Sequence, residues 1–136
     1  MRSALVFIAL VASAACYNPT FNNCDNIGTK FLTVTKIFMS TATPHRGDHL
    51  DISIDAVGQI TGKSLTHYSL IFKLGGVTVD TKQGDINIPL NQGKKFHYAT
   101  TFDVKKIAPK GTYDAYVKIY SGSTEFSCET FKVNLS

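Results

Sequence analysis

Alternation between apolar and polar residues is the main pattern of this chain. From 96 to 104 the even positions carry Phe, Tyr, Thr, Phe and Val, and from 113 to 119 the odd positions carry Tyr, Ala, Val and Ile. Because successive side chains of a strand point to opposite faces, each run predicts a β-strand with one apolar face. Pro109 and Gly111 lie between the runs and favour a tight corner. The two strands therefore need a second sheet to cover their apolar face.

The rest of the chain repeats this pattern and has no sustained helical periodicity. Gly75-Gly76 predicts a hairpin turn, and a change of parity near Cys128 predicts a bulge in the last strand. About seven or eight short strands separated by turn residues are typical of an all-β, immunoglobulin-like antiparallel β-sandwich of two sheets. Besides the two runs above, strands are expected at about 30–40, 49–56, 66–74, 77–82 and 125–135.

The segment from Gln83 to Gly93 is interpreted as a loop that carries a short apolar plug. Apolar residues in a loop need a role. Either they tuck under a sheet as part of the core, or they form the lip of an opening. The residues of this plug are Ile86, Ile88, Pro89 and Leu90.

Residues 1–16 differ in character from the rest of the chain. Arg2 precedes an apolar run from Ala4 to Ala12, and small residues follow. This layout predicts a secretory signal peptide, since the run is too short to cross a bilayer. Cleavage is expected after Cys16, with cleavage after Ala15 as the alternative. Residues 17–136 then form one domain of ordinary size.

Three cysteines are present, and an odd number in an oxidising compartment leaves one thiol without a partner. Removal of Cys16 with the signal peptide would leave an even pair. A bridge between Cys24 and Cys128 would close a loop of about a hundred residues and contribute roughly 4 to 5 kcal/mol on the chain-entropy model. No C-x-x-C spacing indicates redox catalysis or a zinc site.

The formal net charge of +4 is mild, and the lysines are scattered as pairs, Lys94-Lys95 and Lys105-Lys106. A nucleic-acid-binding protein would have a longer basic run, so we expect no nucleic-acid partner. A weak, transient attraction to anionic membrane surfaces is expected instead.

Little in the sequence indicates catalysis or metal binding. His45 and His49 lie near Asp48 and Asp51, but this segment carries turn and strand signals, and imidazoles four positions apart meet on a helix. The chain has no nucleophile elbow and no P-loop. We therefore expect no enzymatic activity, no metal site and no cofactor.

Several short motifs, in this order and spacing, resemble the ML-domain lipid-recognition family over nearly the whole mature chain. The resemblance is greatest to the branch of phosphatidylglycerol and phosphatidylinositol transfer proteins, and the Niemann-Pick type C cholesterol carrier is more distantly similar. The motifs are Phe21-Asn22-Asn23-Cys24, Pro44 to Leu50, Ile88-Pro89-Leu90, Ile107 to Tyr113 and Phe126-Ser127-Cys128.

This resemblance implies two sheets splayed so that a lipid fits between them, and a first-to-last disulfide that joins Cys24 to Cys128. It also implies a monomeric protein of the secreted or endolysosomal space that carries a sterol or phospholipid between membranes. Family members usually have a second cysteine pair around the mid-chain loop. This chain has Ile88 at one of those positions, which leaves the lip of the slot less constrained.

The candidate lipid-binding residues come from the apolar faces of the predicted strands and from the plug. An alternative function is that of a secreted immunoglobulin-like interaction module that binds a protein or glycan through its loops. The candidates are Ile52, Ile54, Leu70, Phe72, Ile88, Pro89, Leu90, Phe96, Tyr98, Phe102, Tyr113, Val117 and Ile119.

Overall fold

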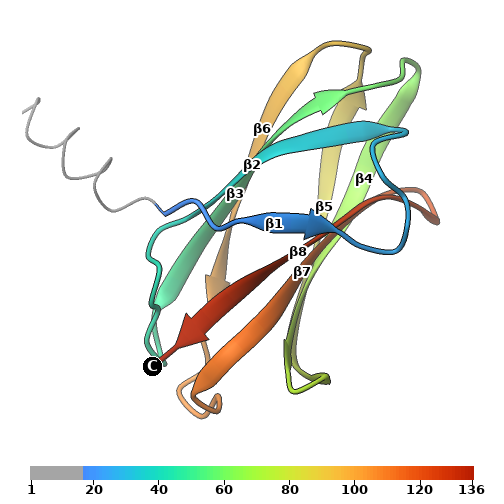
Figure 1. Ribbon diagram of the computed structural model, residues 1–136. Coiled ribbons are helices and arrows are strands. Elements are labelled where there is room, and N and C mark those ends of the chain that lie inside the picture. Colours follow the sequence, from blue (N-terminus) through green and yellow to red (C-terminus); the bar gives the residue numbers. More distant parts are fainter. Residues whose placement is uncertain (1–16) are drawn as a thin grey trace, which may run out of the picture.

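The computed structural model describes residues 17–136, so the predicted signal peptide and its cleavage site lie outside the described residues. This part of the chain forms an antiparallel β-sandwich, which confirms the predicted fold class (Figure 1). Within it, no helix is long and apolar enough to cross a membrane. The strands are β1 (Phe21–Asn23), β2 (Leu32–Met39), β3 (His49–Gly58), β4 (Lys63–Leu74), β5 (Val77–Leu90), β6 (Lys95–Asp103), β7 (Gly111–Ser121) and β8 (Thr124–Leu135).

One sheet has the strand order β1-β8-β7-β4-β5 and the other has the order β2-β3-β6. Buried residues alternate along β3 and β7, as the sequence pattern requires of strands with one face on a core. The apolar faces of the two sheets meet in a single core. Strands β5 and β6 follow one another in sequence but lie at the edges of different sheets.

Two local predictions, a hairpin turn and a bulge, are confirmed. Leu74 pairs with Val77, so Gly75 and Gly76 alone form the β4–β5 turn, and both have positive φ angles of 59° and 82°. A two-residue turn of this kind matches the twist of its strands and requires residues without a Cβ penalty. In β8 the register shifts so that Phe126 is the extra residue between the pairs Ile119–Ser127 and Tyr120–Glu125, which is the predicted bulge.

The predicted loop from Gln83 to Gly93 is wrong. Most of this segment is the second half of β5, which continues to Leu90, and only 91–94 connects it to β6. Pro89 fits because β5 is an edge strand, where a residue without an N–H is tolerated when that position would not donate to the ladder. Gly84 also stays within the strand, opposite Tyr68.

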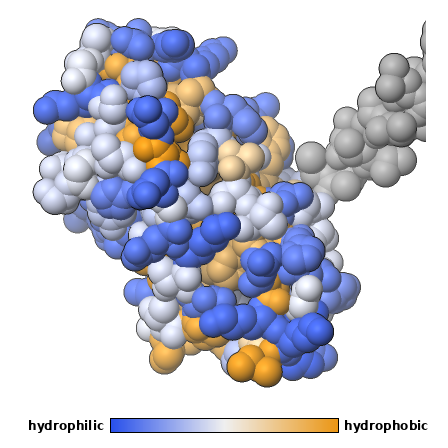
Figure 2. Space-filling view, turned by 180° about the vertical axis from the view of Figure 1, so that it is seen from behind, coloured by the Kyte–Doolittle hydropathy of each residue, from blue (hydrophilic) through white to orange (hydrophobic). Residues whose placement is uncertain are grey.

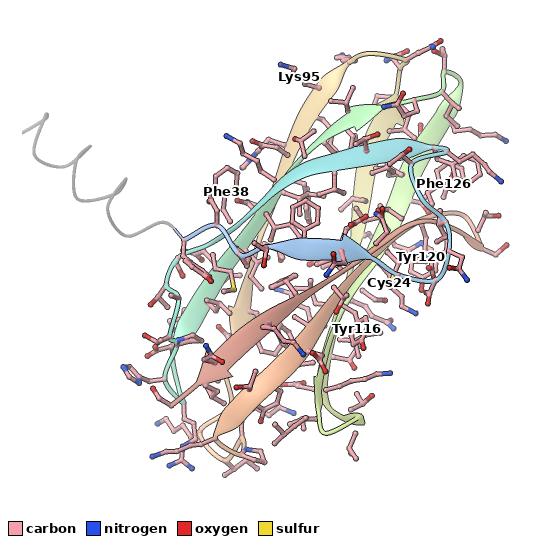
Figure 3. The ribbon with its side chains drawn as sticks, in the orientation of Figure 1. Cys24, Phe38, Lys95, Tyr116, Tyr120 and Phe126 are labelled. Carbon is pink, nitrogen blue, oxygen red and sulfur yellow. A yellow bond between two sulfur atoms is a disulfide. The ribbon has the colours of Figure 1, made fainter. Side chains whose placement is uncertain are left out.

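We call the side of the sandwich formed by β1, β2 and β8 the closed edge. Tyr17 exchanges two backbone hydrogen bonds with Met39 of β2, at 2.8 and 2.7 Å, while β1 a few residues later pairs with β8 of the other sheet. Cys24 and Cys128 form the predicted disulfide, with their Cα atoms 5.0 Å apart. Figure 3 labels Cys24 and Phe126 on this side of the molecule.

Candidate functional site

The space between the two sheets is the main candidate site. It is divided into two lobes, an upper lobe toward the 91–94 connection and a lower lobe toward the Gly75-Gly76 turn (Figure 1). Their free volumes are about 400 and 380 Å³, counting the parts that open to solvent. Only about 30 Å³ of each is wide enough for the centre of a water molecule. The lobes are therefore narrow, and a larger molecule could enter only if their walls move.

The upper lobe is almost entirely apolar and is lined from both sheets. The polar residues along it are Ser53, Tyr68, Tyr98 and Thr100, and no charged residue lines it. The apolar part of its wall consists of Ile52, Ile54, Leu65, Leu70, Ile86, Ile88, Phe96, Val117 and Ile119.

The lower lobe is also apolar, but a charged pair lies at its rim. Lys105 Nζ lies 3.5 Å from Asp80 Oδ1, and both residues line the lobe. The other lining residues are Pro44, Leu50, Phe72, Val79, Phe102, Val104, Ala108, Tyr113, Val133 and Leu135.

Two contacts join the sheets, one in each lobe. The rings of Phe72 and Phe102 pack with their centroids 4.3 Å apart. The hydroxyl of Tyr68 lies 2.8 Å from Oγ1 of Thr100 and forms a hydrogen bond with it. Because Tyr68 belongs to β4 and Thr100 to β6, this hydrogen bond ties one sheet to the other across the slot.

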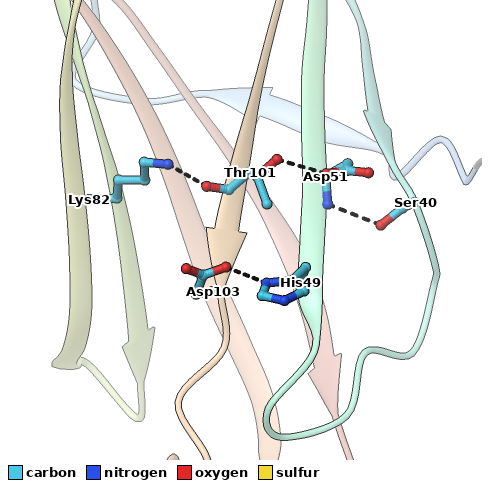
Figure 4. Close-up of polar contacts among 6 residues, drawn as sticks. All are labelled: Ser40, His49, Asp51, Lys82, Thr101 and Asp103. Atoms are coloured by element: carbon cyan, nitrogen blue, oxygen red, sulfur yellow. Dashed lines mark hydrogen bonds and ion pairs between the residues drawn. The ribbon is translucent and has the colours of Figure 1, made fainter.

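We call the side formed by β5 and β6 the open edge. No strand pairing joins these two strands, both of which lie wholly within residues 17–136. Lys82 of β5 donates a hydrogen bond to the carbonyl oxygen of Thr101 of β6 (Figure 4). Asp80 and Lys105 form the ion pair described above. Side chains, and not a backbone ladder, therefore hold the sheets together here.

Burial raises the pKa of three groups, of which Tyr98 and Tyr113 line the two lobes. Desolvation raises the pKa of Tyr98, with a further contribution from nearby Tyr68, and it alone raises the pKa of Tyr113. Desolvation also raises the pKa of Glu129, which is only 1% exposed, although hydrogen bonds from Asn23 and Ser127 oppose the shift. Both tyrosines therefore stay neutral at any physiological pH.

The structure brings most of the predicted lipid-binding residues to the slot. Pro89 is exposed, since it alternates with Ile88 and Leu90 along β5, and Leu90 is buried outside the lining of both lobes. The upper lobe contains Ile52, Ile54, Leu70, Ile88, Phe96, Tyr98, Val117 and Ile119, and the lower lobe contains Phe72, Phe102 and Tyr113.

Sequence reasoning missed Tyr68 and Thr100 among the lining residues. Both carried a usable signal, since Tyr68 shares the even positions of its strand with Leu70 and Phe72, and Thr100 lies between Tyr98 and Phe102 in the same way. His45 and His49, the two histidines close to aspartates in the sequence, do not share a contact. His45 Nδ1 lies 2.5 Å from Ser136 Oγ, and His49 Nδ1 lies 2.5 Å from Asp103 Oδ1 (Figure 4 shows the latter).

Comparison with models of protein families identifies the family of this chain. A family model described as ML domain matches residues 19–135, which is nearly the whole described part. The chain belongs to the ML domain family. The resemblance inferred from the motifs is thereby confirmed. No curated protein sequence matches the chain.

Solved structures support the same fold for this ML domain. A Niemann-Pick type C2 protein from Japanese carpenter ant superposes with a TM-score of 0.66 and 15% identity, covering 86% of this chain and 99% of that one. The sporulation control protein Spo0M from Bacillus subtilis gives a TM-score of 0.64 with 9% identity over 78% of this chain and 49% of its own. At such identities the likeness concerns the fold alone.

Proposed function

We propose that this ML domain binds a sterol or phospholipid between its two sheets and carries it between membranes. The observation that carries the proposal is the apolar two-lobed slot, open along an edge without strand pairing, in a member of a lipid-recognition family. An acyl chain of about 16 methylenes represents roughly 13 kcal/mol of gross transfer free energy from water. Such a ligand needs no catalytic group, because burial supplies the driving force, although the costs of binding remove much of it.

Binding requires the slot to widen, since only about 30 Å³ of each lobe is wide enough for the centre of a water molecule. The open edge is the place where widening costs least. Its contacts are those of Lys82 with Thr101 and of Asp80 with Lys105, partly exposed pairs that each contribute about 1 kcal/mol or less. At the closed edge, by contrast, backbone hydrogen bonds join Tyr17 to Met39 of the other sheet, and the disulfide anchors the β1 segment that follows Tyr17 to β8 of its own sheet.

We further propose that the lower end of the sandwich contacts anionic membranes. Ile107 and Val77, the most exposed large apolar residues of the described chain at 86% and 67%, lie in the β6–β7 loop and beside the β4–β5 turn. Lys105, Lys106 and Lys110 share the loop with Ile107. Figure 2 shows hydrophobic surface at this lower end. Exposed apolar residues with lysines in the same loop suit a bilayer with anionic headgroups.

The expected setting is the secreted or endolysosomal space, where the disulfide would persist. Three further expectations stay predictions: that the protein is a monomer in solution, that it has no nucleic-acid partner and that it is not an enzyme. The last of these agrees with membership of a lipid-recognition family.

A direct test extracts the purified protein with organic solvent and identifies bound lipid by mass spectrometry. Uptake of a fluorescent sterol and a fluorescent phosphatidylglycerol is then measured, followed by transfer from donor to acceptor vesicles. We expect binding of at least one lipid and faster transfer with anionic vesicles. Replacement of Ile107 by Asp should slow transfer while leaving binding intact. Absence of both bound lipid and uptake would overturn the proposal.

The alternative, an immunoglobulin-like interaction module that binds a protein or glycan through its loops, is favoured by one observation. Only about 30 Å³ in each lobe is wide enough for a water centre, as in an ordinary core. The uptake experiment separates the two functions, because an interaction module would bind no lipid.

A further inference from the structure

The upper lobe holds a cluster of three hydroxyl groups, which we call the hydroxyl cluster: Tyr68, Tyr98 and Thr100. The Tyr68 hydroxyl is 2.8 Å from Oγ1 of Thr100, and the rings of Tyr68 and Tyr98 have their centroids 5.5 Å apart. Ser53 also borders the lobe, but it pairs with Ala99 and alternates with the inward Ile52 and Ile54, so its hydroxyl faces the other side of the sheet. The hydroxyl cluster is thus the polar feature of an otherwise apolar cavity.

The position of the Tyr68 ring depends on Gly84, its partner across the β4–β5 ladder. A Cβ at position 84 would lie 2.6 Å from Cε1 of Tyr68 and 2.8 Å from its hydroxyl oxygen. Tyr68 therefore lies directly over Gly84, and this lets its hydroxyl reach β6 in the other sheet. A glycine in the middle of a strand weakens the strand, so its presence here serves the close approach of the ring.

We propose that the hydroxyl cluster is the polar anchor of the ligand, so that the preferred ligand is an apolar molecule with an uncharged hydroxyl or carbonyl group that lies in the upper lobe. This inference rests on the proposed function and specifies the chemistry of the molecule bound. Tyrosine and threonine hydroxyls both donate and accept hydrogen bonds, so the group of the ligand can replace the Tyr68–Thr100 hydrogen bond as the sheets separate.

The character of the cavity sets what the anchor accepts. No charged side chain lines the upper lobe, so an ionised headgroup would lose its hydration there without compensation and must stay outside. A ligand with no polar group would separate Tyr68 from Thr100 and leave both hydroxyls unpaired in an apolar surrounding. Sites that hydrogen-bond a ligand hydroxyl discriminate strongly against the analogue that lacks it, for this reason.

The test compares matched ligands that differ by one hydroxyl: cholesterol with 5-cholestene, and hexadecanol with hexadecane. Each competes with a fluorescent lipid for the full mature chain. We expect wild type to bind the hydroxylated member of the better-bound pair about tenfold more tightly. In the double variant Tyr68→Phe with Thr100→Val this preference should fall to about twofold or less. Because the preference is a ratio, a general loss of stability does not mimic the result.

Two further variants sharpen the test. Gly84→Ala keeps all three hydroxyls but displaces the Tyr68 ring, and it should reduce the preference as well. Tyr116→Phe removes a hydroxyl from the outer face of β7, where Figure 3 labels it, and should leave the preference at the wild-type value.

Equal binding of both members of each pair by wild type, or an unchanged preference in the double variant, would overturn this inference and leave the proposed function standing. Failure of the protein to bind any of the four ligands, together with the absence of extracted lipid, would overturn both.

Discussion

The two edges of the sandwich are held together by different kinds of contact. At the closed edge the chain itself crosses between the sheets: Tyr17 pairs with Met39 of β2, and β1 then pairs with β8. The disulfide fixes the end of β1 to β8. Phe31, just before β2, stacks on Phe126 of β8 with ring centroids 4.0 Å apart. Separation of the sheets here would break the backbone hydrogen bonds of Tyr17 with Met39 and the Phe31–Phe126 stack together, because the disulfide keeps β1 attached to β8 of its own sheet.

At the open edge the sheets face each other through side chains alone, apart from the short 91–94 connection at one end. Lys82 and Asp80 each reach across to one partner, and Tyr68 of the neighbouring strand β4 reaches Thr100 inside the slot. In the upper lobe Ile86 and Ile88 face Phe96 and Tyr98, and all four are only partly buried. These contacts can break singly and form again with solvent or with a ligand.

The difference indicates that the closed edge acts as the hinge and the open edge as the opening of the slot. Motion about such a hinge would widen both lobes while leaving the strand pairings of each sheet intact. The chain has Ile88 at a position where a second disulfide is expected in this family. A disulfide in this region would restrain the strand that must move, so its absence also eases widening of the slot. The expected outcomes below test this assignment, from the largest change to the smallest.

Removal of the disulfide should have the largest effect. The variant with Cys24→Ser and Cys128→Ser loses a cross-link spanning a sequence separation of 104, and its free energy of unfolding should fall by about 4 to 5 kcal/mol. Chemical denaturation followed by circular dichroism measures this loss. Because the hinge is loosened, hydrogen exchange should also increase in β1 more than in β5.

A loss of less than about 1 kcal/mol, or equal exchange gains at both edges, would show that the backbone contacts of Tyr17 and β1 suffice and that the disulfide is not the main restraint of the closed edge.

A smaller, pH-dependent effect is expected at Glu129. Burial raises the pKa of this carboxyl above its usual value of 4.5 in the folded state, so the folded chain holds its proton to higher pH than the unfolded chain. Stability should therefore fall as the pH rises from about 4.5 through the folded-state pKa. Glu129→Gln removes the titrating group, and should stabilise the protein at pH 7 by about 1 kcal/mol relative to wild type.

Denaturation midpoints between pH 4 and 8 measure this difference. Asp85→Asn serves as the control, since Asp85 is an exposed carboxylate of β5. A Glu129→Gln variant whose destabilisation relative to wild type grows as the pH rises from 4 to 8 would show that the hydrogen bonds of the ionised carboxylate with Asn23 and Ser127 outweigh its desolvation.

Much of this fold could be predicted from local pattern, because the period of two along a strand and the chemistry of turns are local properties. Gly75-Gly76 fixed its hairpin, and the parity change near Cys128 located the Phe126 bulge. The error at 83–93 has an equally local cause. Glycine and proline are typical of loops, but Pro89 occupies an edge strand and Gly84 makes room for a ring that belongs to another strand.

The site was harder to predict than the fold, since alternation identifies the inward face but not what fills the space behind it. It placed Ile52, Phe72 and Val117 correctly on the inner faces. It could not show that Tyr68 meets Thr100, because that contact depends on how two sheets pack, and no pattern within one strand specifies this. The division of the slot into two lobes follows from the same packing.

The smallest effect on stability, and the sharpest test of the open edge, is expected from Lys82→Met. The change removes the hydrogen bond to the Thr101 carbonyl but keeps most of the aliphatic stem, so the free energy of unfolding should change by about 0.5 kcal/mol or less. The energy needed to open the slot falls by the same amount, and uptake should become about twofold faster. Stopped-flow fluorescence with a neutral lipid delivered from cyclodextrin measures the rate without any effect of vesicle charge.

Lys36→Met, on β2 at the closed edge, is the matched control and should leave the rate unchanged. If both variants take up lipid at the wild-type rate, the Lys82–Thr101 contact is not broken in the step that limits uptake, which contradicts entry of the ligand at this part of the open edge.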